Sequence, residues 1–383
     1  EFNDVLTNGY KKFGFNSGVD IDTYTFETLH FGTSYLEPGI ITWKRGNPIP
    51  YSNKSINQSL KLAREWFIDN FEDGRFNYLY YPSNGNYPEG RNNMIRQLMA
   101  SRLLAELSEE NKTLRRMHKE NLQYIFNNWY SEENNKGYIY FYNKSKLGAN
   151  AMLLRTMAES PYLSEYKNET NKVVETVLEQ QNEEGSFDAW FIEPDYSYDE
   201  DYLLTFYSGE AILSLVELYK RTGNERLLEA AINSQDFYLD KYVKNIDENY
   251  YPAYVPWHTI SLYKLYEITG KQEYAEAIFK LNDRLLKIQN TGGRPYRDYK
   301  GRFYDPEYPE YGKPHVSSDA VYTEGLAYAH TLAKKLNDTK RANKYEKRLV
   351  LATGNLIRLQ FFGGKMFYLH HPERVKGAFR KNI

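Results

Sequence analysis

The segment between residues 183 and 201 holds eight carboxylates and no basic residue, with aromatic side chains between them. Glycoside hydrolysis needs a pair of carboxyl groups, one protonated as the acid and one ionised as base or nucleophile. Aromatic faces can stack on sugar rings, and by excluding water they raise the pKa of a neighbouring carboxyl group. Asp188 lies beside Trp190 and is the preferred acid of this segment, unless the whole segment is a solvated acidic loop. The candidate sugar-binding residues here are Trp190, Tyr196 and Tyr198.

A second carboxylate, Glu210, follows Tyr207 and Ser208 near the expected start of a helix. Ser208 is a suitable N-cap, which places Glu210 in the first helical turn. The positive end of the helix dipole stabilises a carboxylate there in its ionised form. We therefore expect Glu210 to act as a base, or to accept a hydrogen bond from a sugar hydroxyl beside Tyr207. The alternative is a carboxylate that only caps the helix.

Two more carboxylates, Asp319 and Glu324, occur in the run from Ser317 to Gly325. Ser318 is the expected cap of a helix there, and Asp319 lies in its first turn, where capping is the simpler explanation. Glu324 lies in an otherwise apolar helix, which favours a buried carboxylate paired with an arginine. Both are candidate catalytic residues, and Tyr322 is a candidate substrate contact.

Donors and aromatic residues stand at two further helix starts. Arg91 and Asn92 precede one helix, and an arginine can bind the carboxylate of a uronic acid through two hydrogen bonds. Trp257 and His258 begin another, where His258 is a candidate general acid or base. His258, a tyrosine and Arg91 would together suit proton abstraction beside a uronate carboxylate. The alternatives are a structural ion pair for Arg96 and a structural role for His258.

The composition excludes several classes of function. The chain has 383 residues, no cysteine and a formal net charge of −2. A zinc–thiolate site, an iron–sulfur cluster and a cysteine nucleophile are therefore impossible, and an electrostatic nucleic-acid partner is not indicated. No stretch approaches the roughly 18 apolar residues of a membrane span. No metal, phosphate-loop or dinucleotide motif occurs, so we expect no cofactor and no metal site. Six Asn-x-Ser/Thr sequons slightly favour a location outside the cytoplasm.

Apolar residues that recur with helical spacing predict eleven helices, which form five hairpins and one orphan helix. The orphan helix needs a partner from the far C-terminus, or the ring of hairpins stays incomplete. Residues 1–55 are expected to form an arm with a few short strands, and residues 56–383 one helical domain. The predicted helices are 57–72, 92–108, 112–129, 148–159, 164–181, 208–221, 225–242, 257–268, 272–289, 318–336 and 340–360.

Residues 215–231 and 262–278 match each other at an offset of 47 residues. Each reads as a helix, a Thr-Gly stop and a second helix, with Gly223 and Gly270 at the left-handed position that ends a helix. Self-similarity of this length predicts stacked helical hairpins.

Three features resemble the six-hairpin (α/α)6 toroid superfamily: the two Leu-Tyr-x-x-Thr-Gly hairpins, the Gln180–Phe187 turn and the Tyr207–Leu215 segment. The likeness is greatest to its carbohydrate-active members, the glycoside hydrolases, polysaccharide lyases and sugar epimerases. It implies an all-α toroid whose inner helices line a funnel, with catalytic residues near their N-terminal ends. It also implies an oligo- or polysaccharide substrate. Many of the 37 tyrosines fall in the loops between hairpins, where they would form an aromatic, hydroxyl-bearing rim suited to such a ligand.

The leading hypothesis is a glycoside hydrolase that uses two carboxylates from the set Asp188, Glu210, Asp319 and Glu324. A uronate lyase or sugar epimerase built on His258 is the first alternative. A toroid that binds a glycan or a protein without catalysis is the second.

Overall fold

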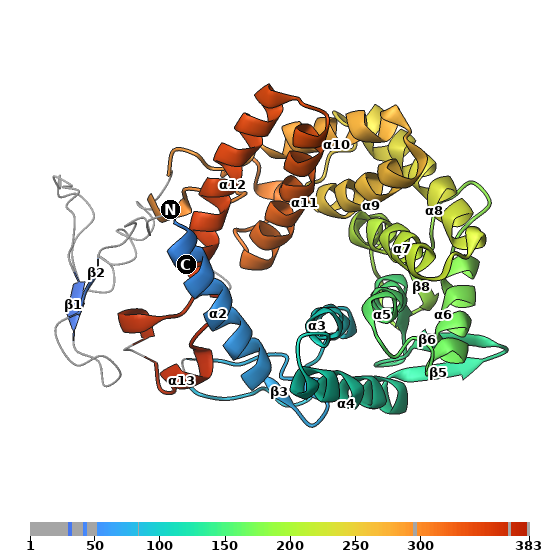
Figure 1. The fold of residues 1–383 in the computed structure, drawn as a ribbon, viewed down its shortest axis with the longest axis horizontal. Coiled ribbons are helices and arrows are strands. Elements are labelled where there is room, and N and C mark those ends of the chain that lie inside the picture. The colour runs from blue at the N-terminus through green and yellow to red at the C-terminus, as the bar shows by residue number, and fades with distance from the viewer. Residues whose placement is uncertain are drawn as a thin grey trace, which may run out of the picture.

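A computed structural model describes residues 30–32, 41–43, 52–82, 84–293, 297–366 and 369–380. It contains every helix that the sequence predicts, and they pair in the predicted order around a ring (Figure 1). The all-α toroid is thus confirmed. The pairs are α3 (Met94–Leu107) with α4 (Lys112–Asn128), α5 (Leu147–Glu159) with α6 (Lys167–Glu179), α7 (Glu200–Thr222) with α8 (Glu225–Tyr238), α9 (Tyr254–Thr269) with α10 (Gln272–Leu285), and α11 (Val316–Lys335) with α12 (Thr339–Leu359).

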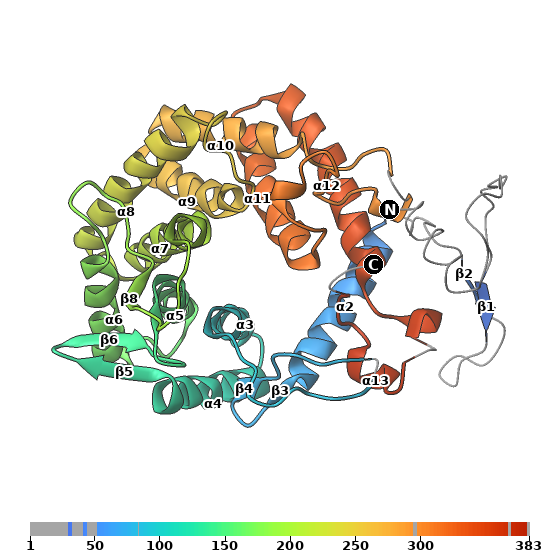
Figure 2. The same ribbon diagram turned by 180° about the vertical axis from the view of Figure 1, so that it is seen from behind.

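The first helix of each pair faces the centre of the ring, as Figure 2 shows from the reverse side. Along this inner layer α3 contacts α5, α5 contacts α7, α7 contacts α9 and α9 contacts α11. Every residue of α5 from Leu147 to Ala158 is buried, as expected for a helix whose sequence is largely apolar on all sides. Gly223 and Gly270 end α7 and α9 with φ near 70°, which confirms the predicted Thr-Gly stops.

Two glycines let the inner helices approach each other closely. A methyl group at Gly209 of α7 would lie 2.5 Å from Trp257 Cβ on α9. One at Gly325 of α11 would lie 2.8 Å from Pro256 Cα, also on α9. Larger residues would force these helices apart, so the two glycines fix the spacing of the inner layer.

The orphan helix α2 (Asn53–Asp69) belongs to the outer layer, between α12 and α4 (Figure 1). The C-terminal segment does supply its partner, because Ser59 Oγ donates to Gln360 Oε1 at 2.7 Å and Trp66 Nε1 donates to the Arg374 carbonyl at 3.2 Å. That partner is irregular apart from a 3-10 turn, η4 (Gly363–Met366), and a single helical turn, α13 (Pro372–Val375). Within the described ranges, the inner layer therefore has five helices against six outside.

Short antiparallel strand pairs join the helices. In the N-terminal arm β1 (His30–Gly32) pairs with β2 (Ile41–Trp43), and residues 1–29 of the predicted arm lie outside the described ranges. β7 (Ser145–Lys146) and β8 (Trp190–Ile192) bring Lys146 opposite Trp190, directly before α5. The other strands are β3 (Phe71–Glu72), β4 (Arg75–Phe76), β5 (Tyr130–Glu133) and β6 (Lys136–Ile139). The π-helix η1 (Leu239–Lys244) and the 3-10 helices η2 (Arg297–Tyr299) and η3 (Pro309–Tyr311) are the remaining short helices.

None of the helices in the described ranges is both long and apolar enough to cross a membrane.

Candidate active site

Glu210 lies in the third turn of α7, because this helix begins at Glu200 and not near residue 208. Asp199 is its N-cap and accepts a hydrogen bond from the Tyr202 backbone N–H at 2.9 Å. The predicted Ser208 cap is therefore wrong, and so is the first-turn position of Glu210. A charge this far from the helix end gains little from the helix dipole, whose effect is confined to the first turn.

Burial, and not the helix dipole, controls the charge of Glu210. Its side chain is 3 % exposed, and Oε2 is buried without a hydrogen-bond partner. Gly148 of α5 makes this position possible, because a methyl group there would lie 2.6 Å from Glu210 Oε2. Removal of water disfavours the carboxylate and raises the pKa of Glu210 to about 8, against weaker opposition from the charges of Arg155 and Lys146. Glu210 is therefore protonated at neutral pH.

Aromatic side chains and a lysine surround the Glu210 carboxyl group. Tyr207 packs beside it against Gly148, and Tyr207 is 6 % exposed. Lys146 lies over the Trp190 ring at 5.4 Å from its centroid, where burial and Lys144 lower the pKa of its amine. The site thus combines a neutral carboxylic acid with a cation that favours the carboxylate left after proton release.

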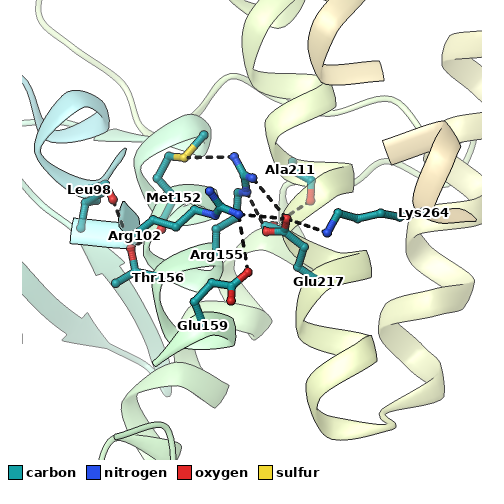
Figure 3. Close-up of polar contacts among 10 residues, drawn as sticks. Leu98, Arg102, Met152, Arg155, Thr156, Glu159, Ala211, Glu217 and Lys264 are labelled. Carbon is teal, nitrogen blue, oxygen red and sulfur yellow. Dashed lines mark hydrogen bonds and ion pairs between the residues drawn. The ribbon is translucent and has the colours of Figure 1, made fainter. Parts of the chain in front are cut away.

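Arg155 is held by Glu217 (Figure 3), which follows Glu210 by seven residues, about two turns, along α7. The guanidinium Nε and Nη2 donate to Glu217 at 2.8 and 3.2 Å, and both side chains are almost fully buried. Lys264 of α9 and Arg102 of α3 approach the same carboxylate at 3.2 and 3.8 Å. These three cations outweigh the cost of burial and lower the pKa of Glu217 to about 2. Glu210 and Glu217 thus hold opposite charge states on one helix.

Asp319 lies in the first turn of α11, as predicted, but it is Asp319 and not Glu324 that is buried and paired with an arginine. Asp319 is the buried, arginine-paired carboxylate: it accepts from Arg302 Nε at 2.9 Å and from the Phe303 backbone N–H at 2.8 Å. It ties the loop before α11 to that helix and is occupied in doing so. Glu324 is exposed and makes no ion pair in the described part of the chain, but its charge acts on Arg155. The cap of α11 is His315, not Ser318.

The acidic segment separates into a turn on the outer layer and the start of α7. Asp188 accepts a hydrogen bond from Asn182 at 3.3 Å, and this turn is fixed to α8 because Gln181 donates to the Ala230 carbonyl at 2.7 Å. Asp188 is therefore not among the residues around Glu210. Glu200 and Asp201 occupy the first turn of α7, which the helix dipole favours.

Two candidate sugar-binding tyrosines, Tyr198 and Tyr196, contact Trp190 and Lys144 respectively. The Tyr198 ring lies 5.2 Å from the Trp190 ring. Tyr196 is 52 % exposed and accepts a hydrogen bond from Lys144 Nζ at 3.1 Å. Trp257 is buried on α9, and the Arg155 guanidinium lies 5.8 Å from its ring.

Arg91 and Asn92 line a cavity of about 480 Å³ between the loop after β4 and the loop before β7. Asn92 also lines a neighbouring cavity of about 200 Å³ that reaches Lys146. Asn92 Oδ1 accepts from the Asn93 backbone N–H at 2.9 Å and from Gln97 Nε2 at 3.0 Å. These two bonds leave its amide NH₂ as a donor.

His258 and Tyr322 are buried in the packing between inner helices. Both ring nitrogens of His258 are engaged, Nδ1 by Gln235 Nε2 at 3.2 Å and Nε2 by Ser208 Oγ at 3.1 Å. Burial lowers the pKa of His258 to about 3, so the imidazole is neutral. Tyr322 packs edge-on against the Phe303 ring, 5.5 Å away, and is 7 % exposed.

Sequence reasoning missed four members of the site: Lys146, Gly148, Arg155 and Glu217. A signal existed for Arg155, since it is the charged residue in the middle of the apolar segment 147–158. No such signal marks Gly148, whose role depends on a contact across the ring. Across the described residues, no three His, Asp or Glu side chains gather in a metal-binding arrangement.

Neutral burial of Glu210 predicts a pH-dependent stability difference between Glu210→Gln and the wild-type chain. The folded chain keeps the Glu210 proton up to about pH 8, whereas its ordinary pKa is 4.5. Wild-type stability therefore falls as pH rises from 4.5 to 8, by on the order of a few kcal/mol. Glu210→Gln lacks this loss, so urea unfolding should find it increasingly more stable than wild type between pH 5 and pH 8.5. A stability difference that does not change with pH would show that Glu210 ionises normally.

A family model of the β-L-arabinofuranosidase GH127 catalytic domain matches residues 92–300, which include α3 to α10 and therefore Glu210, Lys146 and Arg155. No curated protein matches the chain in sequence.

Solved structures that share the fold come from several sugar-active enzymes. A D-mannose isomerase is 12% identical with a TM-score of 0.65, over 87% of this chain and 91% of that one. A sugar epimerase from a ruminal bacterium is 13% identical with a TM-score of 0.61, over 82% and 88%. The GH76 α-mannanase of Bacteroides thetaiotaomicron is 10% identical with a TM-score of 0.55, over 86% and 87%. At these identities the likeness shows the fold alone.

The family model covers more than half of the chain, and it agrees with the carbohydrate-active toroid that the sequence predicts. The chain is a carbohydrate-active enzyme of the glycoside hydrolase class, and it belongs to the family of the β-L-arabinofuranosidase GH127 catalytic domain.

Proposed function

We propose that the chain hydrolyses the glycosidic bonds of an oligo- or polysaccharide, with Glu210 as the proton donor. The observation that carries this proposal is the protonated, buried carboxyl group of Glu210 on the inner helix α7. A general acid must hold its proton at working pH and release it to the departing oxygen. Lys146 and Arg155 stabilise the carboxylate that forms, since both charges favour the ionised state of Glu210.

Glu324 is the proposed second carboxylate. It is exposed on the inner helix α11, and its charge acts on Arg155, which also influences Glu210. Glycoside hydrolysis needs a second carboxylate that activates water or acts as the nucleophile. The two residues differ in environment, since Glu210 is buried and protonated whereas Glu324 is exposed to solvent.

The first compound to test is a β-L-arabinofuranoside, because the family is named for cleaving this type of glycosidic bond. The aromatic residues beside the site, Trp190 and Tyr198, supply flat faces for a sugar ring. Aryl β-L-arabinofuranoside should therefore be compared with aryl glycosides of arabinopyranose, galactose, mannose and glucuronate.

Glu324→Gln should lower kcat by about 10²-fold or more on the best of these substrates, because it removes the second carboxylate. Glu229→Gln on the exposed side of α8 is the matched control and should keep wild-type rates. Release of the aryl group measures both. Full activity of Glu324→Gln would assign the second carboxylate elsewhere, and no turnover of any glycoside would oppose hydrolysis itself.

The environment of His258 gives no support to a lyase or epimerase mechanism based on this residue. Proton transfer by His258 would first have to break its bonds to Ser208 or Gln235. Its pKa of about 3 makes it a weak base.

A further inference from the structure

Two cavities beside the proposed proton donor share a wall. The larger, of about 480 Å³, and the smaller, of about 200 Å³, are both lined by Asn92, Phe141 and Tyr142. The smaller one extends to Lys146 and Ala149. Ala149 follows Gly148, which abuts the Glu210 carboxyl group. A saccharide lying in these cavities would therefore approach the bond that Glu210 protonates.

Four cations line the two cavities, Arg75 and Arg91 in the larger and Lys144 and Lys146 in the smaller. The lining includes a single acid, Glu89. No described carboxylate makes an ion pair with any of the four. Among the described residues, the Lys144 amine has a hydrogen bond only to the Tyr196 hydroxyl, and the Lys146 amine contacts only the face of Trp190.

Several cations elsewhere around the ring are paired with carboxylates. Arg155, Arg102 and Lys264 share the Glu217 carboxylate, and on the outer layer Arg226 forms a two-bond pair with Glu175 at 2.9 and 3.2 Å. The four cavity cations thus leave an excess of positive charge where the chain supplies almost no counter-charge. Lys146 is also partly removed from water, and Lys144 repels it. An anion entering the cavities would relieve both costs.

Neutral groups in the cavities suit a sugar ring. The Asn92 amide keeps its NH₂ group free of the bonds that its oxygen accepts. Tyr78, Tyr87 and Phe141 add aromatic faces and hydroxyl groups to the lining. The Tyr142 hydroxyl donates to the Gly90 carbonyl, which ties together the two loops that form the shared wall. Aromatic faces with nearby donors are the usual setting for a sugar that carries charge.

We propose that the joined cavities bind an anionic group, a carboxylate or a sulfate ester, on a sugar unit close to the bond that is cleaved. The substrate class would then be an acidic glycan. This proposal rests on the proposed function, because the position of the cavities gains its meaning from Glu210 as the proton donor.

The first test compares the kcat/KM of a hexoside, such as the galactoside, with those of its uronate and its 6-O-sulfate counterparts, all with the same leaving group. The wild-type enzyme should prefer an anionic form by about tenfold or more, as for one charged contact. In the double variant Arg91→Gln, Lys144→Gln, the ratio of anionic to neutral rates should fall toward one. Lys61→Gln on α2 removes a surface charge far from the cavities, and it should keep the wild-type ratio.

A second measurement keeps this inference separate from hydrolysis. Calorimetric binding of neutral, uronate-containing and sulfated oligosaccharides to Glu210→Gln needs no turnover. Preference for the uronates identifies a carboxylate ligand, and preference for the sulfated chains identifies a sulfate ester; both support the anionic site. Equal binding of neutral and anionic chains, or a preference that survives the Arg91→Gln, Lys144→Gln change, would overturn it. Preferential binding without hydrolysis of any glycoside would leave the anionic site and refute the proposed function alone.

Discussion

Glu210→Gln should lower kcat/KM on glycosides with alkyl leaving groups by about 10³-fold, while leaving the rate with a dinitrophenyl leaving group within about tenfold of wild type. The amide has the shape of the acid but no proton to give. An alkoxide needs that proton to depart, whereas a dinitrophenolate does not. The pH profile of the wild-type enzyme should agree: kcat/KM on poor leaving groups should fall above about pH 8, where Glu210 loses its proton.

The leaving-group comparison distinguishes proton donation from a general loss of structure. Initial rates of both substrates, measured on the same preparations, give the two ratios directly. Glu229→Gln makes the same chemical change on the outer layer and should alter neither rate. Equal losses with both leaving groups would mean that Glu210 positions the substrate and does not protonate it.

Glu217→Gln is the change with the largest expected cost to stability, about 3–5 kcal/mol. The substitution leaves Arg155, which is 4 % exposed, without the charge that balances it. Lys264 and Arg102 lose the same partner. Urea unfolding at pH 7 measures the effect as a lower midpoint with an unchanged slope.

A more exposed arginine–glutamate pair with two hydrogen bonds provides the control. Glu175→Gln breaks the two bonds from Arg226, whose side chain is 61 % exposed, and should cost less than about 1 kcal/mol. Similar losses for the two variants would show that burial adds nothing to the Glu217 contacts. The low pKa of Glu217, about 2, lies below its ordinary value of 4.5, so its contribution is complete above pH 4.5 and is lost as pH falls toward 2.

The sequence was sufficient to predict the helical hairpins and their order, because both depend on local patterns. Apolar periodicity marked the helices, and Gly223 and Gly270 marked two of their ends. The start of α7 was misplaced because Glu200 and Asp201 resemble the acidic loop before them. In the structure they are the first-turn acids that a helix favours, capped by Asp199.

The candidate site could be predicted only in part, because charge states depend on contacts between distant segments. The sequence singled out Glu210 as a candidate, but the burial that keeps it protonated depends on Gly148, 62 residues earlier in the chain. Helical spacing says which side of a helix is apolar, but it does not show that the centre of the ring is open to solvent. For that reason burial and pairing with an arginine were predicted for Glu324, whereas in the structure Asp319 has them.

A crystal structure of Glu210→Gln with a bound oligosaccharide tests the central claim most directly. We expect the amide at position 210 to lie within hydrogen-bonding distance, about 2.6–3.2 Å, of the oxygen between two sugar rings. Glu324 should face the anomeric carbon of the same bond, either directly or through one water molecule. An oligosaccharide that binds with its glycosidic oxygens remote from position 210 would contradict the account.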